Sequence, residues 1–179
     1  MPLVAGLAGP AAIGATEYVP RACDEMSFKA IAQMMDSAST YATRLVLLKR
    51  SLIQERSTRH PADNEDASRA SDNEEINVET LRNSLGEVWG YLVAAENLAA
   101  VKDLIVDASD RAALDRQLNL VAQRIQEPLS FGLETAENVS AMTKHPEIAA
   151  EVSKIHDFMD KTRTRFAPCA GQVNHERSQ

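Results

Sequence analysis

The side chains best suited to acid–base or metal chemistry in this chain are its four histidines, and their spacing favours neither. They are His60, His145, His156 and His175. No two are three or four residues apart, and the chain has no E-x-x-H or H-E-x-x-H motif, so no pair shares a helix face as a metal site of this kind requires. His156 and Asp160 are four residues apart, which is more typical of a surface pair than of a catalytic base held by a carboxylate. We therefore predict no metal site and no catalytic histidine.

The two cysteines, Cys23 and Cys169, stand at opposite ends of the predicted helical region. In an antiparallel bundle of four helices, the start of the first helix and the end of the last lie at the same end. A Cys23–Cys169 disulfide would close a loop of about 145 residues, which the chain-entropy model values at on the order of 5 kcal/mol. Two free thiols, normal in a reducing cytosol, are the alternative. Neither cysteine has a histidine placed beside it by the sequence, so we predict no catalytic cysteine.

Patterns for binding phosphate or activating a serine are absent. The chain contains no G-x-x-x-x-G-K-[ST], G-x-G-x-x-G or G-x-S-x-G motif and no S-x-x-K set. The sequence therefore predicts no cofactor and favours a protein that is not an enzyme.

The net charge of −7 argues against a nucleic-acid partner, because such binding needs clustered Lys and Arg. Residues 44–59 carry five basic side chains against one acidic, whereas residues 63–79 carry seven acidic against one basic. We expect these two segments to neutralise each other. No run approaches the roughly 18 apolar residues of a membrane span. A lipid or membrane surface is therefore a less favoured partner than a protein.

Apolar residues recur at spacings of three and four along most of the chain, which predicts amphipathic helices. The first helix, from Asp24 to near Thr58, has a coiled-coil-like seam over three heptads. The second opens at Asp72, whose D-x-x-E spacing to Glu75 suits a capping box. The third begins at Ser109 and is kinked or split at Pro128. The fourth runs from Pro146 to a stop at Pro168 and Gly171. These elements predict an all-α protein folded as an antiparallel four-helix bundle.

The predicted organisation is one bundle domain, residues 23–169. An irregular leader, 1–22, precedes it, and a disordered tail, 170–179, follows it. Within the domain, residues 59–74 are rich in Asp, Asn, Glu and Ser and are predicted to form a mobile acidic loop. We expect a soluble, cytoplasmic protein; if the apolar leader is a signal peptide, the protein is secreted instead.

A candidate partner groove follows from glycines around the only tryptophan. Gly86, Gly90 and Ala94 are four residues apart, so a helix would place them in a row of small side chains beside Trp89. Such a row lets a second helix approach closely. The neighbour could be another helix of this chain. It could also be a partner or ligand, with Trp89 as the anchor.

The favoured function is therefore that of a non-enzymatic interaction or scaffold protein that binds a protein partner or associates with itself through amphipathic helices. One alternative is a coat protein on a lipid or polymer surface. The alanine-rich run LAAVKDLIVDASDRAALDRQLNLVAQ (98–123) is similar in style to phasins, which coat polyester storage granules. Another alternative is a small-ligand sensor with its site inside the bundle.

Overall fold

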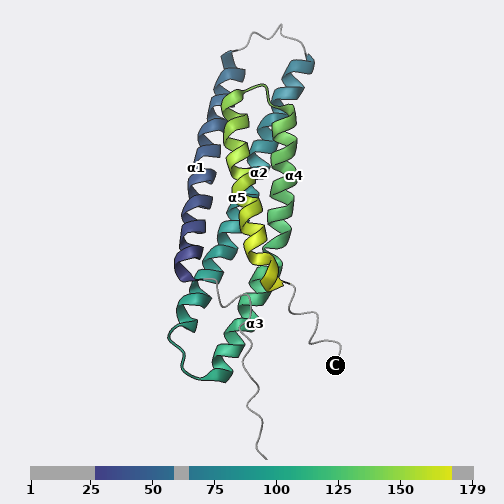
Figure 1. Cartoon of the computed structure of the whole chain (residues 1–179). Coiled ribbons are helices and arrows are strands. Elements are labelled where there is room, and N and C mark those ends of the chain that lie inside the picture. The colour runs from purple at the N-terminus through teal and green to yellow at the C-terminus, as the bar shows by residue number, and fades with distance from the viewer. Residues whose placement is uncertain (1–26, 59–64, 171–179) are drawn as a thin grey trace, which may run out of the picture.

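The computed structural model describes residues 27–58 and 65–170, and each regular element in these ranges is a helix. Figure 1 shows the chain running up α1, down α2, up through α3 and α4, and down α5. This is the predicted antiparallel four-helix bundle, with α3 and α4 together forming its third helix. The helices are α1 (Phe28–Thr58), α2 (Glu65–Lys102), α3 (Ala108–Arg124), α4 (Gln126–Met142) and α5 (Pro146–Ala170).

The predicted apolar seams form the core. Every position of the apolar seam is buried on α2 and on α5. On α1 and α4, most positions of the seam are buried. Burying these stripes against one another is what makes helices of this length stable in water. Met142, three residues beyond the buried Val139, is 45% exposed because α4 ends there. The buried residues of the two complete seams are Val78, Leu81, Leu85, Val88, Leu92, Ala95 and Ala99 on α2, and Ile148, Val152, Ile155, Met159, Thr162 and Phe166 on α5.

The predicted break at Pro128 is confirmed. Helix α3 ends at Arg124 and α4 begins at Gln126, so the break falls one turn before the proline. Proline has no N–H to donate to the carbonyl four residues earlier, and its ring crowds that turn. The backbone N–H of Ile125 and that of Leu129 still donate to Val121 and Ile125, so the helix bends and continues.

The acidic loop predicted for residues 59–74 is wrong over its second half. Helix α2 begins at Glu65, and Asp72 and Glu75 lie inside it rather than at its start. Residues 65–74 contain no proline or glycine to stop the helix from extending back. Both carboxylates form ion pairs with Arg56 of α1 instead of capping the N-terminus of α2.

Two smaller boundaries also differ. The N-cap of α3 is Asp107 rather than Ser109, because an Asp107 carboxylate oxygen accepts hydrogen bonds from the backbone N–H groups of Ser109 and Asp110. Pro168 lies inside α5, whose last described residue is Ala170. The predicted leader, 1–22, and residues 171–179 of the predicted tail lie outside the described residues.

Helix α2 lies at the centre of the packing and contacts α1, α3 and α4. Helix α1 rests mainly on α2 and touches α5 only lightly. The α1–α5 contact includes an ion pair, Arg44 Nη1 to Glu151 Oε1 at 2.9 Å, and a ring contact between Tyr41 and Phe158 with centroids 5.5 Å apart. The α1 edge is therefore where this bundle is least closed. None of the described helices is both long and apolar enough to cross a membrane.

Candidate partner groove

Two of the four histidines, His145 and His156, lie within the described residues, and His156 has another partner than the one predicted. His156 pairs loosely with Glu137, at 3.7 Å from Nε2 to Oε1, whereas Asp160 binds Arg163. The predicted His156–Asp160 pair is therefore wrong. Both side chains of the His156–Glu137 pair are largely exposed, which makes it a weak surface contact. His60 and His175 lie outside the described residues.

His145 stands at the start of α5 and faces carboxylates from three helices. Its Nε2 lies 3.6 Å from Glu55 and 3.9 Å from Glu74, and its Nδ1 lies 3.6 Å from Glu147. These distances are longer than direct hydrogen bonds. The described residues contain no group of three His, Cys, Asp or Glu side chains that could hold a metal ion. His145 therefore lies where the end of α1, the start of α2 and the start of α5 meet.

The cysteine prediction falls partly outside the described residues. Cys169 is fully buried near the end of α5, and the start of α1 lies at the same end of the bundle, as expected (Figure 1). Cys23 precedes the described residues, so the Cys23–Cys169 bridge stays a prediction.

A groove of about 290 Å³ runs between α1 and α2 at the predicted glycine row. We call it the Trp89 groove. Helix α1 gives it small side chains, and α2 gives it Gly86 on one wall and Trp89 at its edge. Of the four residues predicted to form a partner groove, Gly86 and Trp89 line this groove, whereas Gly90 and Ala94 do not. That a partner binds there stays a prediction. The lining residues of the groove are Ala38, Ser39, Ala42, Thr43, Val46, Arg82, Leu85, Gly86 and Trp89.

The glycine row is not filled by the described part of this chain. A β-carbon built on Gly86 or Gly90 would meet no atom within 4 Å, and both residues are exposed. Intrachain packing therefore does not require glycine at either position. Trp89 is 43% exposed, and its indole N–H donates to no described residue. An exposed aromatic beside an unfilled groove is the arrangement found at the anchors of protein interfaces.

Two of the polar side chains that line the Trp89 groove, Thr43 and Arg82, are already hydrogen-bonded within the chain. The Thr43 hydroxyl donates to the Ser39 carbonyl of its own helix, at 3.0 Å. Arg82 at the rim binds Glu79 and the Asn83 side-chain oxygen. Only the Ser39 hydroxyl and the Trp89 indole N–H are left without a partner among the described residues to orient a small ligand. The volume of the groove also lies just below the roughly 300–1,000 Å³ of ligand pockets.

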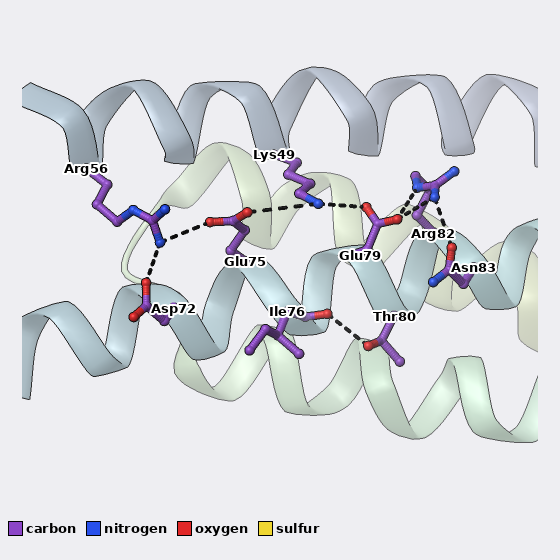
Figure 2. Close-up of polar contacts among 9 residues, drawn as sticks. All are labelled: Lys49, Arg56, Asp72, Glu75, Ile76, Glu79, Thr80, Arg82 and Asn83. Carbon is purple, nitrogen blue, oxygen red and sulfur yellow. Dashed lines mark hydrogen bonds and ion pairs between the residues drawn. The ribbon is translucent and has the colours of Figure 1, made fainter.

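A row of alternating basic and acidic side chains runs along the contact between α1 and α2 to Arg82 at the groove (Figure 2). We call it the ladder; its members are Arg56, Asp72, Glu75, Lys49, Glu79 and Arg82. Arg56 binds Asp72 and Glu75, and Lys49 lies 3.9 Å from Glu75. The basic and acidic segments of the sequence do neutralise each other here, as expected. The ladder adds ion pairs to the apolar packing between α1 and α2 on the side where the groove lies.

At the end of the ladder, Glu79 accepts hydrogen bonds from Arg82 and from Lys49. These bonds, the one from Arg82 foremost, lower the pKa of Glu79 to about 2 and raise the pKa of Arg82. Both groups therefore stay charged through the physiological range, and Arg82 is held at the rim of the Trp89 groove.

The glycine that helix packing does require is Gly132 on α4. A β-carbon there would lie 2.5 Å from Met159 Sδ and 3.3 Å from the Ser84 β-carbon. Gly132 is where α4 meets both α5 and α2. The sequence analysis missed it because a single glycine in a helix has no row of small residues to mark it.

Comparison with known proteins adds no relative: no protein-family model, curated protein or solved structure matches this chain.

Proposed function

We propose that this protein is a non-enzymatic interaction module that binds an amphipathic helix of another protein chain in the Trp89 groove. The observation that carries the proposal is the open space above Gly86, next to a half-exposed Trp89. Glycine costs about 1 kcal/mol in a helix interior relative to alanine. No described residue packs so closely on Gly86 that a larger side chain would be excluded. A helix of another chain docked in the groove would need this space, which would explain why glycine is present.

The chemistry of the groove favours a helix over a small ligand. Its walls are mostly small and apolar, which suits the close approach of a helix ridge. The ion pairs between α1 and α2 hold the two walls of the groove together before binding. Little conformational entropy is therefore lost when a partner docks. Trp89 at the edge offers a large apolar surface with one free donor.

The test is photo-crosslinking in native cells, with a benzophenone amino acid in place of Thr43 on the exposed groove wall. It is combined with Gly86→Leu, which fills the groove. The matched control is Gly90→Leu, the same change one turn away on the same helix, outside the groove. Both glycines face open space, so both variants are expected to fold.

We expect a discrete crosslinked protein whose yield falls at least about fivefold with Gly86→Leu, corresponding to a lost contact of about 1 kcal/mol or more. Gly90→Leu should leave the yield unchanged. An adduct that is insensitive to Gly86→Leu, or no adduct at Thr43, would overturn the proposal.

A further inference from the structure

The connection between α2 and α3 is the most exposed apolar feature of the described structure. Leu104 is 82% exposed, Val106 is 94% exposed and Val101 is 46% exposed. We call these three residues the apolar tip. Figure 1 shows this turn projecting beyond the adjacent ends of α1 and α5. Single exposed apolar residues are ordinary, but a contiguous group at a projecting end marks an interaction surface.

The apolar tip is held rigidly. The Arg111 guanidinium donates to the Ile105 carbonyl at 2.7 Å, and Asp107 caps α3 immediately after the turn. Behind it, Lys102 Nζ lies 2.6 Å from Oδ1 of Asp115, in an ion pair that is nearly buried. That oxygen has no other hydrogen-bond partner, so the ion pair is what satisfies it. A preformed tip loses little conformational entropy on docking.

Acidic groups surround the tip. Asp103, Asp107 and Asp110 are all exposed, and none forms an ion pair with a described residue. The nearest exposed cation, Arg111, is bound to the turn itself. A surface that is apolar at its centre and negative at its rim fits an apolar groove with a positive rim, and it is poorly suited to an anionic membrane.

The described structure contains such a groove on another face, between α1 and α5. It has a volume of about 510 Å³, and we call it the basic groove. Met34 and Phe158 form its apolar part, and Lys161 and Arg165 stand on its α5 side. Both cations are exposed, and neither forms an ion pair with a described residue. The one carboxylate that lines it, Asp160, is already bound to Arg163.

The helix dipole does not account for these two cations. Its effect falls off within the last turn of a helix, and the last turn of α5 contains no basic residue. The basic groove also lies where α1 touches α5 only lightly, so its walls are free to receive a neighbour.

We propose that the apolar tip of one copy of this protein docks in the basic groove of a second copy. Leu104 and Val106 would contact the apolar surface at Met34 and Phe158, while Asp103 and Asp110 would face Lys161 and Arg165. Because the two surfaces differ, the contact is head-to-tail and leaves one tip and one groove open in each dimer. The contact involves neither Gly86 nor Trp89. A test of this contact is therefore independent of the test of the function proposed above.

The test is sedimentation of the full chain, comparing the wild type, two interface variants and two control variants. The tip variant is Leu104→Ser with Val106→Ser, and the groove variant is Lys161→Glu with Arg165→Glu. All four side chains are exposed, so folding is retained. Matched controls make the same kinds of change at other exposed side chains: Leu47→Ser with Ile76→Ser, and Arg50→Glu with Lys144→Glu.

For the wild type and both controls we expect the mean mass to rise between roughly 10 and 500 µM protein, as for an interface at the small end of the range. The rise should weaken with added salt, which screens the charged rim. Each variant alone should remain monomeric. An equimolar mixture of the tip and groove variants should form dimers and stop there, because one intact tip meets one intact groove.

A monomeric wild type over this range would overturn the proposal, including the case where residues of the same chain cover the basic groove. So would association that survives in either variant alone, association lost equally in the controls, or a mixture that fails to dimerise.

Discussion

At the scale of single residues, three glycines inside helices have opposite physical roles. Gly132 is buried where α4 contacts Met159 and Ser84, so its missing side chain is needed for packing. Gly86 and Gly90 face open space. Sequence spacing could identify the row at Gly86 and Gly90. It could not tell whether the row is covered, because that depends on how α1 lies against α2.

These roles predict opposite effects of alanine. Gly86→Ala and Gly90→Ala should each stabilise the fold by about 0.5–1 kcal/mol, because alanine is the better helix former and meets no neighbour. Gly132→Ala should destabilise it by about 1 kcal/mol or more, because the new methyl group overpacks the buried Met159 side chain. Urea denaturation of the three variants measures this directly. Equal effects at Gly86 and Gly132 would contradict the assignment.

At the scale of helices, the apolar seams were sufficient to predict the bundle, and Pro128 itself was sufficient to predict the break in its third helix. The start of α2 was not predictable in this way. Residues 65–74 lack apolar periodicity, and the contacts that hold Asp72 and Glu75 come from Arg56 on another helix. Local patterning does not contain such long-range pairings. The same limit explains why the tip and the basic groove, which depend on how helix ends are staggered, were not identified from the sequence.

The α1–α2 ladder predicts a defined pH dependence through Glu79. The pKa of Glu79 is about 2 in the folded protein against an ordinary 4.5, so the unfolded chain takes up this proton first as the pH falls. The stabilisation from Glu79 is therefore fully present above about pH 4.5 and is lost as the pH falls toward 2. Its size is roughly 1 kcal/mol, because Glu79 and its partners are only partly buried.

Glu79→Gln should accordingly lower the free energy of unfolding at pH 7, and the difference from the wild type should shrink between pH 4.5 and 2. Glu134→Gln is the control, since Glu134 is exposed and forms no ion pair with a described residue. Chemical denaturation across this pH range makes the comparison. A deficit for Glu79→Gln that stays constant down to pH 2 would show that the ladder does not hold this carboxylate charged.

At the scale of the whole molecule, the bundle is well closed around α2 and α5 and open along both flanks of α1. One flank, against α2, holds the Trp89 groove, and the other, against α5, holds the basic groove. The basic groove follows from the light contact between α1 and α5. The Trp89 groove follows from the small residues that α1 and α2 place opposite each other. Two grooves that no described residue fills and a projecting apolar tip support the proposed role in binding other chains.

The most direct test of the central claim is the accessibility of Trp89, the only tryptophan, to a fluorescence quencher in dilute purified protein. Because Trp89 is 43% exposed beside an unfilled groove, acrylamide should quench most of its emission. Addition of the partner captured by crosslinking at Thr43 should protect it, and Gly86→Leu should abolish that protection. A Trp89 already shielded in the isolated protein would show that this chain covers its own groove, and would contradict the account.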